Sequence, residues 1–168
     1  TIGLLGNPNC GKSTLFNRLT GASQRVGNWP GVTVEQKSGS LRLGDQKIEV
    51  IDLPGIYSLD QTLGGVDESI AQNFMRSEQC DLIINVVDAS HLDRHLTLTQ
   101  QLLEYDVPVI VALNMLDVAE SLGITVSAED LEKTLGVPVV PMIASKAEGL
   151  KVLLDLLSHH SANGALKE

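Results

Sequence analysis

Residues Gly6 to Ser13 read Gly-Asn-Pro-Asn-Cys-Gly-Lys-Ser, which fits the Gly-x4-Gly-Lys-Ser pattern of a phosphate-binding loop. The apolar run 2–5 precedes this stretch, and the helix-forming run 13–19 follows it. A strand, a glycine-rich turn and a helix in this order direct backbone N–H groups and a helix N-terminus at one phosphate chain. Lys12 can reach the outer phosphates, and the Ser13 hydroxyl can bind magnesium. We therefore predict a P-loop rather than an incidental glycine-rich turn.

The composition is that of one globular domain. The chain has 168 residues, of which 43% are hydrophobic and only 3% aromatic, so aliphatic side chains must fill the core. A formal net charge of −9 argues against a broad nucleic-acid-binding surface, and we expect no nucleic-acid partner. The two cysteines, Cys10 and Cys80, predict no disulfide scaffold, which favours a reducing cytosolic setting. The sequence starts at Thr1 without an initiator methionine, so we interpret it as a fragment of a longer protein.

Apolar runs alternate with helical patterns along the chain. Strands are predicted at 2–5, 33–43, 47–53, 82–88, 109–114 and 137–142, and helices at 13–19, 67–77, 92–105, 128–135 and 150–159. Several runs are almost wholly apolar, as in parallel strands that are covered on both faces. Gly44-Asp45 predicts a hairpin turn and hence one antiparallel strand. These patterns predict an α/β P-loop fold with a mostly parallel six-stranded sheet, one antiparallel strand and helices on both faces.

Three segments lack a regular pattern. The stretches 22–31 and 54–66 are rich in Gly, Ser, Asn, Pro and Asp, and we predict that they are loops flanking the phosphate site. Residues 161–168 are predicted to be a frayed tail. We find no linker or repeat, so we predict one domain over residues 1–160.

A second motif, Asp52-Leu53-Pro54-Gly55, ends the predicted strand 47–53. A carboxylate at a strand end can hold magnesium, usually through water, and the Gly55 N–H can contact a terminal phosphate when the loop closes. Asp-x-x-Gly also occurs in ordinary turns, but its place after an apolar strand and downstream of a P-loop favours a functional role.

A third motif, Asn114-Met115-Leu116-Asp117, follows the buried strand 109–114. The Asp117 carboxylate can accept hydrogen bonds from N1–H and the exocyclic amine of guanine, a donor pair that adenine lacks, so it favours GTP over ATP. Asn114 is expected to tie this segment to the P-loop. The alternative for Asp117 is a helix N-cap.

Two further segments give weaker signals. Thr33 lies in Gly31-Val32-Thr33, and its hydroxyl could complete the magnesium shell when a γ-phosphate is present, which makes the segment an order–disorder switch. The alternative for Thr33 is an ordinary β-branched strand residue. The stretch Ile143-Ala144-Ser145-Lys146 could supply backbone contacts to the base.

Together the motifs resemble, in order and spacing, the G domain of translation-factor-class and Ras-like GTPases. Three longer stretches narrow the resemblance: 24–35 (QRVGNWPGVTVE), 52–59 (DLPGIYSL) and 85–90 (NVVDAS) with 92–94 (LDR). These are similar to the N-terminal cytosolic GTPase domain of the bacterial ferrous iron transporter family FeoB. The resemblance implies a GTP-hydrolysing domain on the cytoplasmic side of the bacterial inner membrane that regulates ferrous iron transport. It also implies a transmembrane transport module in the same polypeptide as partner, with a homo-oligomer left open.

The resemblance implies Mg2+ and K+ as cofactors and assigns roles to individual residues. The expected nucleotide-binding residues are Gly6, Asn7, Pro8, Asn9, Cys10, Gly11, Lys12, Ser13, Thr14, Gly31, Val32, Thr33, Asp52, Gly55, Asn114, Met115, Asp117, Ala144 and Ser145. Lys12, Asn9, Thr33 and Gly55 are expected to act in catalysis. Ser13, Thr33 and Asp52 are expected to bind magnesium. Asn9 and backbone carbonyls around Gly27 and Trp29 are expected to bind potassium, which could stabilise the charge that builds up on the phosphates, as an arginine finger does. From the residues alone, Asn9 would be an ordinary turn residue.

Three departures from the Ras-like pattern bear on rate and exchange. Ile56 stands where many GTPases keep a water-orienting Gln, so intrinsic hydrolysis is expected to be slow, a departure that FeoB proteins share. Met115 replaces the usual Lys and can still pack on the base edge. Ile143 replaces the common Ser of the base loop and leaves only backbone donors there, so nucleotide exchange is expected to be fast.

Other interpretations and residues stay open. The same motifs would suit a ribosome- or RNA-assembly GTPase, or a nucleotide-sensing module with negligible catalysis, which Ile56 makes tenable. His91, His95, His159 and His160 have no metal-ligand spacing, and we interpret them as solvated helix positions. Trp29, in a polar segment, is either a partly exposed anchor or a contact for the rest of the parent protein.

Overall fold

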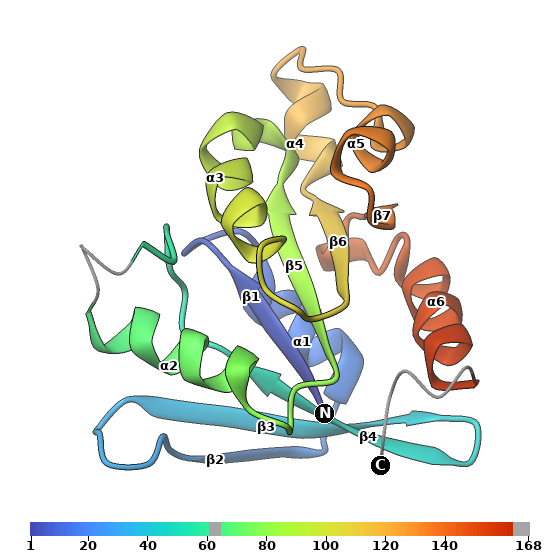
Figure 1. Ribbon diagram of the computed structural model, residues 1–168. Helices are drawn as coiled ribbons and strands as arrows, with labels where there is room; N and C mark the ends of the chain where they lie inside the picture. Colours follow the sequence, from blue (N-terminus) through green and yellow to red (C-terminus); the bar gives the residue numbers. More distant parts are fainter. Residues whose placement is uncertain (61–64, 163–168) are drawn as a thin grey trace.

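The computed structural model describes residues 1–60 and 65–162, without the side chains of residues 161 and 162 (Figure 1). Its centre is a seven-stranded sheet in the order β2-β3-β4-β1-β5-β6-β7. The strands are β1 (Ile2–Gly6), β2 (Gln24–Asn28), β3 (Glu35–Leu43), β4 (Gln46–Asp52), β5 (Leu82–Asp88), β6 (Val109–Asn114) and β7 (Val139–Pro141). Among the described strands only β3 runs against the others, because it pairs antiparallel with both β2 and β4 while the remaining pairs are parallel.

The predicted sheet type is confirmed, but the predicted number of six strands was wrong. The extra strand, β2, lies within the segment 22–31 that we expected to be a loop. All five of its residues are exposed, so it carries no alternating hydrophobic pattern and is held to β3 through the backbone. The predicted hairpin turn at Gly44-Asp45 joins β3 to β4, with Leu43 opposite Gln46.

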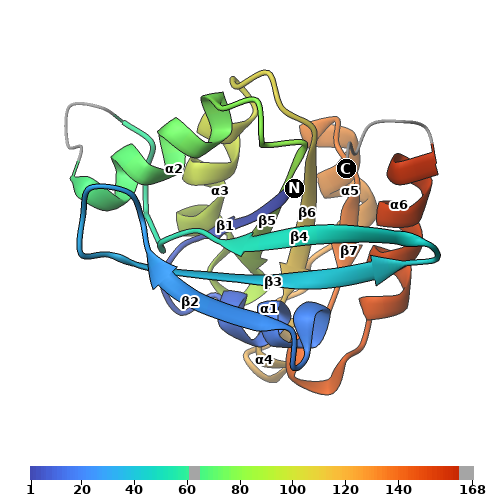
Figure 2. The same ribbon diagram turned by 90° about the horizontal axis from the view of Figure 1, so that it is seen from below.

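Helices cover both faces of the sheet, as predicted, and Figure 2 shows α2 and α3 on one side and α1 on the other. They are α1 (Lys12–Thr20), α2 (Val66–Arg76), α3 (Leu92–Leu102), α4 (Leu116–Ser121), α5 (Ala128–Leu135) and α6 (Leu150–Ala162), with the 3-10 turns η2 (Ala89–His91) and η3 (Ala144–Lys146). The short α4 was not predicted. The helix α6 reaches Ala162, the second residue of the predicted frayed tail 161–168; the rest of this tail lies outside the described residues, and its fraying stays a prediction.

Two apolar clusters, one on each face, form the core. Alternate residues of each central strand serve opposite faces: Ile83 and Val87 of β5 pack with α2 and α3, whereas Leu82, Ile84 and Val86 pack with α1 and α6. This explains why β5 reads as a continuous apolar run, with all seven residues buried. Within the described residues, no helix is both long and apolar enough to cross a bilayer.

The parallel strands end together at one edge of the sheet, and this edge carries the motifs. Gly6 ends β1, Asp52 ends β4, Asp88 ends β5 and Asn114 ends β6. In Figure 1 the arrowheads of the neighbouring strands β5 and β6 both point toward the top of the view. Ligands of open parallel sheets bind at such an edge, so the fold brings together polar groups that are far apart in the sequence.

Candidate nucleotide-binding site

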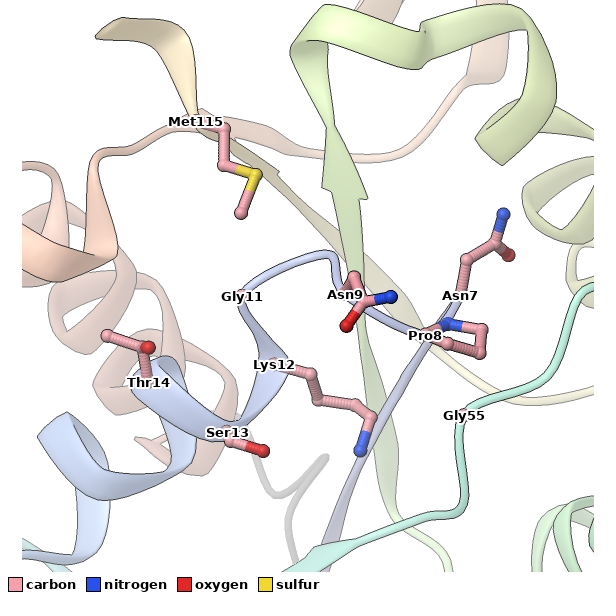
Figure 3. Close-up of a pocket in the computed structure, with 9 residues that line it drawn as sticks. All are labelled: Asn7, Pro8, Asn9, Gly11, Lys12, Ser13, Thr14, Gly55 and Met115. Atoms are coloured by element: carbon pink, nitrogen blue, oxygen red, sulfur yellow. The ribbon is translucent and has the colours of Figure 1, made fainter. Parts of the chain in front are cut away.

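The P-loop wraps around an open cavity of about 530 Å³. The cavity is lined by Asn7, Pro8, Asn9, Gly11, Lys12, Ser13, Thr14, Gly55 and Met115 (Figure 3). Two loop residues adopt left-handed backbone conformations, Asn9 with φ 65° and Gly11 with φ 90°. A Cβ on Gly11 would collide with Asn114 Nδ2, so the second glycine of the motif is required by both conformation and space. The strand, loop and helix predicted around this motif are confirmed.

Lys12, which lines the cavity, forms an ion pair with Asp52. The Lys12 ammonium group donates a hydrogen bond to Asp52 Oδ1, and the side chains are 11% and 12% exposed. Figure 3 shows Lys12 and Ser13 extending into the same space as Asn9. An ammonium group, a hydroxyl and a carboxylate at one helix N-terminus form a donor set suited to a phosphate chain and a hard cation.

Asn114 joins the P-loop to the last loop of the sheet edge. Its Nδ2 donates to the Cys10 carbonyl at 3.0 Å, and its Oδ1 accepts the Ala144 N–H at 2.9 Å. The side chain is 3% exposed. The predicted tie between Asn114 and the P-loop is therefore present, and the same amide also holds the segment that was expected to contact the base.

The residues predicted to meet the base lie at the neighbouring strand end. Met115 has φ 61° and precedes α4, and its methyl group lies near Gly11. Asp117 is half-buried in the first turn of α4, and because Met115 holds the N-cap position, the alternative of an N-cap at Asp117 was wrong. Ala144 is buried and Ser145 exposed in η3. Sequence analysis missed Arg18, which donates from α1 to the carbonyls of both.

The first predicted switch lies away from this cavity. Thr33 and Gly31 are exposed in the connection from β2 to β3, and neither lines the cavity. Gly27 pairs with Gln36 in the sheet, and the Trp29 carbonyl accepts the Val32 N–H at 3.2 Å. The Trp29 indole is 8% exposed and packs edge-on against Phe74 at 6.3 Å between ring centroids, so neither interpretation offered for it, an exposed anchor or an external contact, fits.

The second predicted switch folds directly onto the P-loop. The Ile56 N–H donates to the Gly6 carbonyl at 3.1 Å, and a Cβ on Gly55 would lie 3.2 Å from Pro8. Ile56 is 1% exposed, so its side chain belongs to the core.

Two glutamines hold the chain just beyond this segment. Gln101 of α3 accepts the Leu59 N–H at 2.6 Å and exchanges hydrogen bonds with the Ser58 hydroxyl. Gln72 of α2 donates to the Leu59 carbonyl at 2.8 Å. Both backbone groups of Leu59 are thus fixed by side chains that sequence analysis did not select.

Burial shapes the titration of two groups near the site. It raises the pKa of the Cys10 thiol to about 11, against the opposing effect of Lys12, so this P-loop thiol stays protonated near neutral pH. It also lowers the pKa of His95, although the Asp88 carboxylate opposes that shift. His95 is 6% exposed and its Nδ1 accepts the Asp88 N–H at 3.3 Å, so our assignment of His95 to a solvated position was wrong.

Asn7 differs from the other loop residues. Its amide group is buried, and neither polar atom has a hydrogen-bond partner in the described part of the chain. Figure 3 shows this side chain turned away from Lys12. Its role as a nucleotide contact, through the backbone in this arrangement, stays a prediction. Over residues 1–60 and 65–162, no group of three or more His, Cys, Asp or Glu residues could hold a metal ion.

The P-loop, the Asp-x-x-Gly segment and the Asn-x-x-Asp segment on this sheet define a P-loop NTPase of the G-domain class. A family model described as ferrous iron transport protein B matches residues 1–157. The chain belongs to this family, FeoB, and corresponds to its N-terminal G domain.

Known relatives agree with this assignment. The Fe(2+) transporter FeoB of Legionella pneumophila (strain Paris) is 55% identical over 160 residues, covering 94% of this chain and 21% of the relative, so the chain spans about a fifth of that protein. The solved cytosolic domain of L. pneumophila FeoB has a TM-score of 0.87 and 55% identity, covering 95% of this chain and 68% of that one. A GDP-bound mutant of the S. thermophilus FeoB G domain has a TM-score of 0.88 and 44% identity, covering 99% of this chain and 63% of that one.

Proposed function

We propose that this chain binds GTP with Mg2+, hydrolyses it slowly, and regulates Fe2+ transport by a membrane module of the same polypeptide. The observation that carries the proposal is the cavity lined by Lys12 and Ser13, with Asp52 paired to Lys12, in a P-loop that Asn114 links to the base loop. Family membership and the GDP-bound relative support the choice of guanine nucleotide and of iron transport. The share of its relatives that this chain spans supports a transport module elsewhere in the polypeptide.

In the proposed reaction, Lys12 leaves Asp52 and binds the outer phosphates, while the backbone N–H groups of the loop bind the remaining phosphate oxygens. Asp117 accepts the guanine N1–H and amine protons. Gly55 already lies against Pro8 of the P-loop, and its N–H would contact a terminal phosphate when the loop closes. With Ile56 in the core, no side chain at that position orients the water, which supports a slow intrinsic rate.

The residues fit Mg2+ better than they fit a complete K+ site. The Ser13 hydroxyl faces the cavity and the Asp52 carboxylate ends β4 beside it, which are the hard oxygen donors that Mg2+ prefers, and Thr33 would join them if the first switch moved inward. A bound Mg2+ would neutralise charge on the phosphates. Asn9 faces the cavity and could bind K+ there, but Gly27 and Trp29 do not line the cavity, so their carbonyls could help only if the first switch moved toward it.

Nucleotide titration tests the binding site. A fluorescent GTP analogue with Mg2+ should bind the wild type tightly, and Lys12→Ala and Ser13→Ala should abolish tight binding because each removes a phosphate or metal partner. Arg42→Ala, an exposed residue near the hairpin end of β3, is the control and should bind like wild type. Wild-type affinity in Lys12→Ala would overturn the proposed site.

Base selection and turnover complete the test. Asp117→Asn replaces an acceptor by an amide, which suits the carbonyl at C2 of xanthine, so this variant should lose GTP affinity and gain affinity for the xanthine nucleotide. Turnover of GTP should exceed that of ATP and should be faster in K+ than in Na+. Equal rates in both salts would remove K+ and Asn9 from the mechanism, and absence of phosphate release over hours would leave a nucleotide-sensing module.

A further inference from the structure

Arg18 connects the P-loop helix to the base loop. It lies in the last turn of α1, and its guanidinium group donates to two successive carbonyls, Nε to Ala144 at 3.1 Å and Nη2 to Ser145 at 2.6 Å. Resting on the proposed function, we propose that Arg18 is a positioning residue that fixes the base loop on α1 and thereby slows release of guanine nucleotides.

The contacts of the base loop show what Arg18 fixes. Of the N–H groups of residues 144–147, Ala144 donates to Asn114, Lys146 to Ile143 and Ala147 to Ala144. In the described part of the chain this leaves the Ser145 N–H as the donor that the loop can offer to a base.

Peptide geometry links this donor to Arg18. The Ala144 carbonyl and the Ser145 N–H belong to one trans peptide and point in opposite directions. By holding the Ala144 carbonyl, Arg18 therefore sets the direction of the Ser145 N–H. The second bond, to the Ser145 carbonyl, fixes the next peptide in the same way.

The loop has few other supports on this side. Ala144 is 2% exposed and packs in the same apolar cluster as Leu15 of α1, but Ser145 and Lys146 are exposed. Ile143 offers no hydroxyl to brace the loop from within. Loss of Arg18 would thus leave the Ala144 carbonyl with the Ala147 N–H, a bond within the loop itself, and would leave Asn114 as the side chain that ties Ala144 to the P-loop.

Arg18 could instead act only through its charge, because a cation in the last turn interacts favourably with the helix dipole and stabilises the helix. Lysine separates the two roles: it keeps the charge but lacks the planar fork that reaches two carbonyls at once. Methionine keeps much of the length and removes both. If the fork matters, Arg18→Lys and Arg18→Met should both release nucleotide faster than wild type.

The experiment measures dissociation of fluorescent GDP by stopped-flow displacement, together with single-turnover GTP hydrolysis. We expect about tenfold faster GDP release for Arg18→Met and a smaller increase for Arg18→Lys, because affinity losses at a fixed interface are mostly changes in dissociation rate. Single-turnover hydrolysis should be unchanged, since the phosphate end is untouched. Arg42→Met, which removes an exposed arginine distant in sequence from both loops, should behave like wild type.

The outcomes distinguish this inference from the proposed function. If wild type binds GDP and Arg18→Met releases it at the wild-type rate, the inference is wrong and the proposed function stands. If wild type itself fails to bind, the proposed function is wrong. A wild-type release rate in Arg18→Lys would assign the effect to charge alone. Slower hydrolysis with a lower unfolding temperature in both variants would indicate a structural role. Either result would contradict the proposed role of the guanidinium group in holding two carbonyls at once.

Discussion

Asn114→Ala should weaken both the fold and the site, because one side chain satisfies two buried backbone groups. The amide spans the Cys10 carbonyl and the Ala144 N–H at 3.0 and 2.9 Å, and it packs so closely on Gly11 that no Cβ would fit between them. Alanine can make neither hydrogen bond and leaves a gap next to the cavity.

The size of the effect follows from these two bonds. Leaving a buried donor or acceptor unpaired costs about 1–3 kcal/mol, so the loss of both partners sums to about 2–6 kcal/mol. Water from the adjoining cavity can reach part of this space and replace some of the lost bonding. We therefore expect the free energy of unfolding to fall by about 2–4 kcal/mol, the lower part of that range.

Urea unfolding with and without GDP measures both consequences. At a GDP concentration of about 100 Kd, wild type should gain about 2.7 kcal/mol, and a tenfold weaker variant should gain only about 1.4 kcal/mol at the same concentration. Asn73→Ala, an exposed amide on α2, is the control and should change stability by less than about 0.5 kcal/mol. A loss below about 1 kcal/mol in Asn114→Ala, with an unchanged GDP gain, would refute the assignment of Asn114 as the link between the loops.

Three further predictions concern residues around the site. Gln101→Leu should remove the acceptor of the Leu59 N–H and increase proteolysis or hydrogen exchange of residues 57–60 with a stability loss of about 1–2 kcal/mol; unchanged exchange there would contradict it. Burial lowers the pKa of His95 below 6.5 in the folded state, so the unfolded chain takes up the proton first as the pH falls. The free energy of unfolding should therefore decrease as the pH falls below 6.5. Urea unfolding at about pH 7.5 and about pH 5.5 should show a smaller decrease in His95→Gln than in wild type. Burial raises the pKa of the Cys10 and Cys80 thiols to about 11, so a thiol reagent near neutral pH should react slowly until the protein unfolds, and rapid reaction of the native protein would contradict this.

The parts of the fold that the sequence predicted are those with a strong local signal. The buried strands β5 and β6 are continuous apolar runs, and α5 begins and ends where predicted because Ser127 caps it through the Asp130 N–H and Gly136 ends it with φ 74°. Fully exposed β2 has no such signal, since none of its side chains is buried and it therefore shows no alternating hydrophobic pattern. The six-residue α4 is too short to show a helical period.

The same difference in local signal separates the site residues that the sequence predicted from those that it did not. Its motifs were readable because the chemistry of a phosphate chain demands particular residues at fixed spacing within one loop, as in the segment from Gly6 to Ser13. Gln101, by contrast, meets its backbone partner Leu59 42 residues away, and its side chain recognises a peptide group that every residue carries. Buried Trp29 was misjudged for a related reason: its segment is polar, and the ring that covers it, Phe74, belongs to α2.

These unpredicted contacts share one property that bears on how the domain could switch. Arg18 acts on the loop at 144–145 and Gln101 acts on the chain after Gly55, and each of these contacts ends on a backbone group. A contact to backbone fixes loop position whatever nucleotide is bound, so these residues can set exchange and closure without altering recognition. Recognition itself falls to the short motifs. Substitutions at the backbone-binding residues should therefore change rates more than nucleotide preference, whereas those at the motif residues should change both.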